Sequence, residues 1–126
     1  MINTAQALNE FWNGFGIPAY KVNTVPDEQP DGTQTEPPYI TYSIVETEPL
    51  EPATHYAQVF YRGTALAALL SKVDEIKEAI GTGAIIKCNG GYVVLRPASP
   101  FSQLMIDADP DVRYAYINLQ VNCYHD

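Results

Sequence analysis

The stretch TALAALLSKVDEIKEAIG, residues 64 to 81, decides how the rest of the chain has to fold. Its apolar residues recur at spacings of three and four, which places them along one stripe of an α-helix. The stripe consists of Leu66, Leu69, Leu70, Val73, Ile76 and Ile80. The charged residues, Lys72 among them, fall on the opposite side, while Thr64 is a candidate N-cap and Gly81 a candidate stop. Strand-like segments flank the helix, so we expect a sheet to cover the stripe.

Composition bounds the kind of protein. The chain has 126 residues, of which 46% are hydrophobic, and this fits a single domain over residues 1–126. Fifteen acidic and seven basic residues give a formal net charge of -8. That charge repels phosphate backbones and anionic lipids, so we expect no direct binding of nucleic acid or membranes. The sequence contains no long apolar span and no secretion-signal pattern, which predicts a protein made in the cytosol.

The first half of the chain predicts one short helix, a long loop and two strands. Residues 2–15 carry apolar side chains at helical spacing. Five prolines and four acids between residues 17 and 38 predict a long acidic loop without regular structure. Alternating apolar and polar residues then predict strands over 39–45 and 56–62, joined by an acidic turn at 46–52.

The second half predicts three further strands. Residues 84–88 and 92–96 flank Asn89-Gly90-Gly91, where glycines permit a tight hairpin. Three prolines predict an irregular stretch over 97–110, and strict alternation over 112–124 predicts a long strand with one dry and one wet face. The order is helix, two strands, helix, three strands. It predicts an α+β fold: a mainly antiparallel sheet of about five strands with two helices packed on one face.

An acidic triplet is the first candidate for chemistry. Asp107, Asp109 and Asp111 have the spacing that begins a calcium-binding loop. Val112 and Asn118 stand where such a loop needs glycine and glutamate, so the calcium motif fails. We expect a solvated turn with an acidic cap instead.

Cysteine and histidine give no stronger signal. Cys123 and His125 supply only half of a structural zinc site, and Cys88 is the one other thiol. We expect both cysteines to stay reduced in strands. His55 has no serine or cysteine motif beside it that marks a nucleophile. The sequence therefore predicts no catalytic residue, no metal and no cofactor.

The nine tyrosines are more informative. Eight of them fall in the predicted strands, and one sheet face under two helices cannot hide them all. They are Tyr39, Tyr42, Tyr56, Tyr61, Tyr92, Tyr114, Tyr116 and Tyr124. Two interpretations stay open: an ordinary sheet with half-buried tyrosines, or a subunit interface, where tyrosine is enriched.

Charge is divided unevenly along the chain. Residues 22–61 contain seven acids and no lysine or arginine, while six of the seven basic residues follow residue 61. Opposite charges at two ends favour head-to-tail contact between identical copies, which closes into a ring when the rotation repeats. The candidate interface residues are Asp27, Glu28, Asp31, Glu36, Tyr39, Tyr56, Arg62, Arg96, Arg113, Tyr114 and Tyr116.

Five short features also stand in a characteristic order. They are PYITY at 38–42, RGT at 62–64, the helix end IG at 80–81, the GG hairpin at 90–91 and RYAYINL at 113–119. In this order they resemble small tail-terminator proteins of long-tailed bacteriophages and related prophages. The resemblance extends over most of the chain and lies in ordering and texture, not in a signature motif.

The resemblance implies a structural role. Proteins of that family are α+β subunits that form a hexameric ring at the head-proximal end of the tail tube. There they stop tube growth and meet two partners, the tail tube protein and the head-tail connector or stopper. This implies assembly in the host cytoplasm, a place in the virion and no catalytic residues.

Two alternatives stay open. One is a head-tail stopper or another minor tail or capsid-joining protein. The other is a small ligand-binding or enzyme domain, which needs a pocket with convergent polar groups. In that case a mutational scan is expected to find His55, Asp107 or Asp109 essential for function, while the variants still assemble normally.

Overall fold

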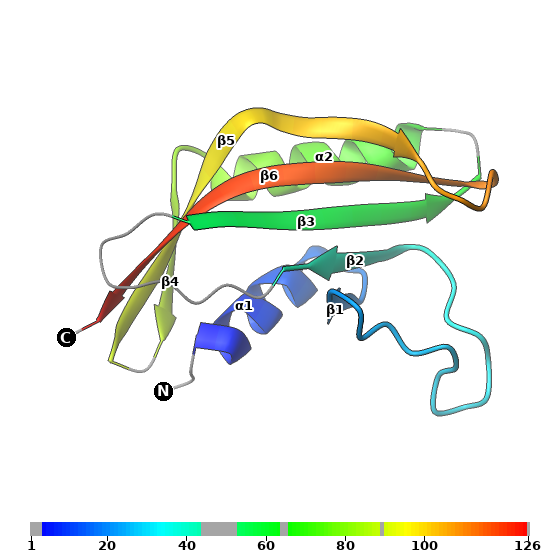
Figure 1. Ribbon diagram of the computed structural model, residues 1–126, viewed down its shortest axis with the longest axis horizontal. Coiled ribbons are helices and arrows are strands. Elements are labelled where there is room, and N and C mark those ends of the chain that lie inside the picture. The colour runs from blue at the N-terminus through cyan, green and yellow to red at the C-terminus, as the bar shows by residue number, and fades with distance from the viewer. Residues whose placement is uncertain (1–3, 44–52, 64–65, 89, 126) are drawn as a thin grey trace.

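A computed structural model of the chain describes residues 4–43, 53–63, 66–88 and 90–125. Within these residues two α-helices and a six-stranded sheet form an α+β fold (Figure 1). The helices are α1, Thr4–Trp12, continued by the 3₁₀ turn η1, Asn13–Phe15, and α2, Ala67–Ile80. The strands are β1, Ala19–Lys21; β2, Tyr39–Tyr42; β3, Ala53–Arg62; β4, Ala84–Cys88; β5, Gly91–Ile106; and β6, Val112–His125.

The sheet is mixed, with the strand order β1-β2-β3-β6-β5-β4. β1 runs parallel to β2, and every other neighbouring pair is antiparallel. β3 and β6 lie at the centre and pair along the whole of β3, from Ala53↔Val121 to Arg62↔Val112. The α+β class is confirmed. The expectation of about five strands is corrected to six, because β1 was not predicted.

β1 lies inside the segment 17–38 that the prolines predict to be a loop. Three residues are too few to show an alternating pattern, so the sequence gives no signal for this strand. The strand forms because β2 offers it a partner: Ile40 N–H donates to the Pro18 carbonyl at 2.8 Å, and Val22 N–H donates to the Tyr42 carbonyl at 2.8 Å. The loop is therefore shorter than predicted and begins after β1.

β5 is longer than predicted. It continues to Ile106, so the expectation of irregular structure over 97–110 is wrong for residues 97–106. The register against β6 shifts between Pro97 and Ser102, and this irregularity accommodates residues that have no N–H for the ladder. β3 likewise begins earlier than residue 56. The predicted turn at 46–52 and the Thr64 N-cap lie outside the described residues.

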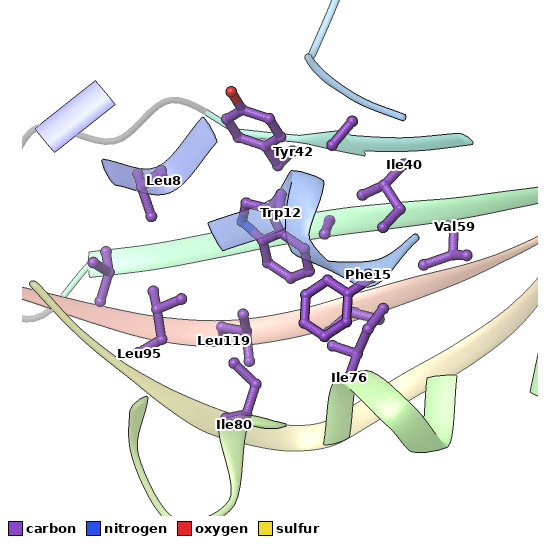
Figure 2. Close-up of a cluster of buried hydrophobic side chains, with 14 of the residues drawn as sticks. Leu8, Trp12, Phe15, Ile40, Tyr42, Val59, Ile76, Ile80, Leu95 and Leu119 are labelled. Atoms are coloured by element: carbon purple, nitrogen blue, oxygen red, sulfur yellow. The ribbon is translucent and has the colours of Figure 1, made fainter. Parts of the chain in front are cut away.

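One hydrophobic core joins both helices to the same face of the sheet (Figure 2). Trp12 of α1, Ile76 of α2 and Leu119 of β6 are all fully buried within it. The remaining large, fully buried members are Ile40, Tyr42, Val59, Leu69, Ile80, Val93, Leu95 and Ile117. The prediction that two helices pack on one face is confirmed.

The predicted stripe of α2 is confirmed at four of its six positions, with Leu69, Val73, Ile76 and Ile80 buried. Leu66 is half-buried, and Leu70 is 43% exposed because it lies at the margin of the buried stripe. Lys72 does not simply point away: its Nζ donates to the Phe15 carbonyl at 2.6 Å and so ties α2 to η1. Gly81 stops the helix with a φ of 55°, where its N–H still donates to the Lys77 carbonyl.

Two adjacent leucines test this packing. Leu69 is fully buried, so Leu69→Asp places an unpaired carboxylate in the core at a cost of several kcal/mol. We expect that variant to be unfolded or insoluble. Leu70→Asp is the matched control, because its carboxylate stays in water, and its melting temperature by circular dichroism should lie within a few degrees of the parent's. Equal melting temperatures for the two variants would contradict the buried stripe.

Candidate interaction surface

The sheet face opposite the helices carries aromatic side chains. Along β3 and β6 the buried residues that face the core alternate with residues that are mostly half-buried or exposed, as a two-faced strand requires. In the described part of the chain, neither helix covers this second face. Its aromatic residues come from five strands and are called the aromatic face: Tyr20, Tyr39, Tyr56, Phe60, Tyr92, Tyr114, Tyr116 and Tyr124.

A continuous row of rings crosses four strands at one end of this face. Phe60 stacks on Tyr114 with ring centroids 4.9 Å apart, and Tyr39 meets Phe60 edge to face at 5.1 Å. Tyr20 of β1 extends the row, with its ring 6.1 Å from that of Tyr39. Burial is the main reason that the pKa of Tyr39 is raised above 10. Each ring therefore covers part of its neighbours and leaves its outer side toward solvent.

Two further stacks lie on the same face. Tyr56 stacks on Tyr116 at 5.3 Å, and Tyr92 stacks on Tyr124 at 4.9 Å. Burial, followed by the neighbouring Tyr56, raises the pKa of Tyr116. The rings are half-buried, apart from Tyr92, which is 41% exposed. Half-buried tyrosines are thus present as the first interpretation of the sequence expects, and the second interpretation, a subunit interface, stays a prediction.

A hollow of about 330 Å³ adjoins the last of these stacks. It is lined by Thr82, Gly83, Ile85, Tyr92, Val94, Arg96 and Tyr124. Arg96 supplies its charge and donates a hydrogen bond to Asn122 Oδ1 at 3.0 Å. The volume is at the lower end of the range for small-molecule pockets.

Three charged candidates meet at the end of the sheet opposite this hollow. Arg62 Nη2 lies 2.6 Å from Glu36 Oε2, and Arg62 Nη1 lies 3.4 Å from Asp109 Oδ2. The hydrogen bond that Arg62 donates to Glu36 is the main cause of the raised pKa of Arg62. The Asp111 N–H, and then Arg62, lower the pKa of Asp109. Glu36 and Arg62, which charge alone would assign to different copies, are therefore paired within one chain.

The other acidic candidates lie in one turn of the chain. Residues 27–36 are here called the acidic segment. It folds back on itself through a bridge between Glu28 and Gln34 and a 2.9 Å hydrogen bond from Thr35 N–H to the Asp27 carbonyl. The Thr33 hydroxyl donates a hydrogen bond to Asp31 Oδ1 at 2.6 Å, and this bond lowers the pKa of Asp31. Asp27, Glu28 and Asp31 are exposed, so their carboxylates face solvent.

The candidate interface residues thus do not form one cluster but lie at both ends of the sheet. Arg113 donates to the Pro110 carbonyl near the Arg62 end, whereas Arg96 lies beside the hollow at the far end. Sequence reasoning missed Phe60, which links two tyrosines of the aromatic row, although it stands among strand aromatics. It also missed three exposed apolar residues on β5, Leu104, Met105 and Ile106, because the prolines before them predict irregular structure.

His55 belongs to the core and not to an open site. It is fully buried, and Trp12 Nε1 donates to its Nε2 at 3.0 Å. Because Nε2 accepts, we assign the proton to Nδ1, which lies 3.0 Å from Ser43 Oγ. Ser43 Oγ also accepts from Tyr56 N–H at 3.0 Å. The ring therefore joins α1 to the end of β2 and to β3, with both nitrogens used.

The acidic triplet forms the turn that the sequence predicts. Asp109 N–H donates to Asp107 Oδ2 at 3.2 Å, and Asp111 N–H donates to Asp109 Oδ1 at 3.0 Å. Among the described residues, no three His, Cys, Asp or Glu side chains are grouped to hold a metal ion. The turn and His55 lie at opposite ends of β3, roughly 20 Å apart along the strand, so they do not form one site. Cys88 and Cys123 are free and buried.

Comparisons of this chain with protein-family models, with curated proteins and with solved structures give no match. In the part of the chain that is described, no helix is both long enough and apolar enough to span a membrane.

The His55 network makes a prediction about pH. Burial lowers the pKa of His55 from 6.5 to about 4. Between pH 4 and 6.5 the unfolded chain therefore binds a proton at His55 more readily than the folded chain does. The free energy of unfolding has its full value above pH 6.5 and decreases as the pH falls toward 4. The loss is about 3 kcal/mol. We expect His55→Gln to lack this part of the pH dependence in denaturant titrations.

Proton NMR measures the same pKa directly. The chain has two histidines, so His125→Gln assigns the imidazole signals. The His55 signal should titrate well below pH 6.5. A His55 pKa near 6.5 would show that the ring is not held neutral in the core.

Proposed function

We propose that this chain is a structural subunit of a bacteriophage tail, a tail terminator. In this role about six copies form a ring at the head-proximal end of the tail tube. The ring stops tube growth and joins the tail to the head connector. Its partners are other copies of itself, the tail tube protein and the connector or stopper.

The aromatic face is the observation that supports this proposal most. The three ring contacts Phe60–Tyr114, Tyr56–Tyr116 and Tyr92–Tyr124 occupy one side of the sheet that neither helix covers in the described residues. Aromatic residues with a polar end are enriched in protein interfaces, where the ring is buried and the hydroxyl finds a partner. A face of this kind suits a subunit that is covered by other proteins in its working state.

Charge gives a second, independent line of support. The Glu36–Arg62 pair is satisfied within the chain, which leaves Asp27, Glu28 and Asp31 exposed in the acidic segment. Basic groups lie on other elements, at Arg96 of β5 and Arg113 of β6. Contacts between different surfaces of identical copies generate rings when the rotation closes. This arrangement favours such contacts over a symmetric pairing of like with like.

A head-tail stopper, or another minor tail or capsid-joining protein, is the nearest alternative. The hollow beside Arg96 is the feature that favours a small-ligand domain instead. It lies apart from His55 and from the 107–111 turn, so a ligand there uses none of the residues that the sequence suggested for chemistry.

Deleting the gene from the phage or prophage that carries it tests the proposal. Electron microscopy should show tails of abnormal length that are not attached to filled heads, because tube growth no longer stops. Supplying the intact gene in trans should restore normal particles. Supplying Leu69→Asp should not, because that subunit does not fold.

Other images would point elsewhere. Tails of normal length beside empty, leaking heads would identify a stopper. Fully normal virions would refute a structural role in the particle.

A further inference from the structure

The second half of β5 forms an open edge of the sheet. β4 pairs with β5 only from Gly91 to Leu95, whereas β6 pairs with β5 as far as Ile106. In the described residues, no strand pairs with the outer side of β5 beyond Leu95. In Figure 1 this part of β5 runs along the upper margin of the sheet.

The register shows which backbone groups point outward. Asp107 N–H donates to the Val112 carbonyl, so residue 107 faces β6. Successive residues of a strand turn their N–H and C=O to alternate sides. Met105 and Gln103 therefore also face β6, while Ile106 and Leu104 present their N–H and C=O groups to the open side.

The side chains of this edge are unusual for an edge that stays in water. Leu104, Met105 and Ile106 are 51%, 41% and 69% exposed. Protein edges are normally protected by charges, prolines, bulges or a covering loop. The bulge and prolines of β5 end before Ser102, and residues 102–106 contain no charge and no proline.

The edge at the other side of the sheet is protected. β1 is three residues long, and Asn13 covers its first residue. Ala19 N–H donates to Asn13 Oδ1 at 2.9 Å, and Asn13 Nδ2 donates to the Ala19 carbonyl at 3.3 Å. The β1 edge is thus closed by the side chain of Asn13, whereas the β5 edge beyond Leu95 has no such cover among the described residues. This difference marks the β5 edge as a surface for a partner.

We propose that the open edge of β5 binds the acidic segment of a second copy of this chain by strand addition. This inference rests on the proposed ring and names its contact. Strand addition suits the edge because the outward N–H and C=O groups of Leu104 and Ile106 need an extended partner. The bridge between Glu28 and Gln34 gives the acidic segment two short extended stretches that can meet this need. Alternate side chains of that partner would enter a groove of about 180 Å³. The groove is lined by Leu66, Leu104, Met105, Ile106 and Arg113.

Charge and position select the acidic segment as the occupant. Arg113 lines the groove, and the acidic segment carries exposed carboxylates at Asp27, Glu28 and Asp31. The segment joins β1 to β2, so it lies at the side of the sheet opposite β5. Arg62 contacts both Glu36 and Asp109, which places the segment at the same end of the sheet as the turn after β5 (Figure 1). If a second copy lies beside the first along the direction in which the strands are ordered, its acidic segment therefore reaches the β5 edge of the first copy.

Cross-linking between two cysteine variants tests the contact. Ile106→Cys labels the edge and Asp31→Cys labels the acidic segment, while the natural Cys88 and Cys123 are buried. The variants carry tags of different size and are mixed at millimolar concentration with bismaleimidoethane. We expect a cross-linked heterodimer in the mixture and none from Ile106→Cys alone. A homodimer of Ile106→Cys would indicate symmetric pairing of two β5 edges and overturn the proposal, as would the absence of any cross-link.

A proline at the edge separates strand addition from simple apolar contact. Leu104→Pro removes an outward N–H that the isolated subunit does not use, so the fold should be kept. Self-association measured by sedimentation should weaken by at least about tenfold. Leu104→Ala keeps the N–H and should weaken association less. Equal losses for the two variants would overturn strand addition.

Failure of this inference is distinguishable from failure of the proposed function. Rings in the particle without the Ile106–Asp31 cross-link would overturn this contact and leave the terminator role in place. A specific cross-link together with normal virions from the deletion would support the contact and refute the tail role.

Discussion

The register of β6 between β3 and β5 is the constraint on which the rest of the structure depends. Gly63 N–H bonds to the Asp111 carbonyl on one side, and Asp107 N–H bonds to the Val112 carbonyl on the other. Together these bonds fix which residues of three strands face the helices. A slip of one residue would exchange the two faces, placing tyrosines in the core and leucines in water. The same register fixes which backbone groups of β5 point to the open edge.

A buried polar network adds a second constraint. Trp12 of α1 is hydrogen-bonded to His55 of β3, and His55 is hydrogen-bonded to Ser43, which directly follows β2. A buried donor or acceptor without a partner costs free energy, so these bonds favour the observed position of α1 against β3. The helix face of the sheet is thereby closed by specific contacts. Among the described residues, the aromatic face is not covered by either helix, and the β5 edge beyond Leu95 is not paired with a strand.

Sequence reasoning succeeds here where a pattern is long and fails where contacts are made over long range. The α2 stripe and the alternation of β6 extend over many residues, so core position follows from spacing alone. β1 has no pattern of its own and forms because β2 lies beside it, and β5 continues past its prolines because a register shift accommodates them. For the candidate surface, strand tyrosines were predictable. The pairing of Glu36 with Arg62 was not, because only the fold brings the two side chains together.

Amide hydrogen exchange at the β5 edge tests most directly whether the chain leaves this edge open for another copy. The amides of Leu104 and Ile106 should exchange rapidly in the dilute protein, whereas those of Gln103 and Met105, directed at β6, should be protected throughout. On assembly, protection at Leu104 and Ile106 should rise by at least about a hundredfold, toward that of a paired strand. Unchanged exchange at Leu104 and Ile106 in assembled protein would contradict the account.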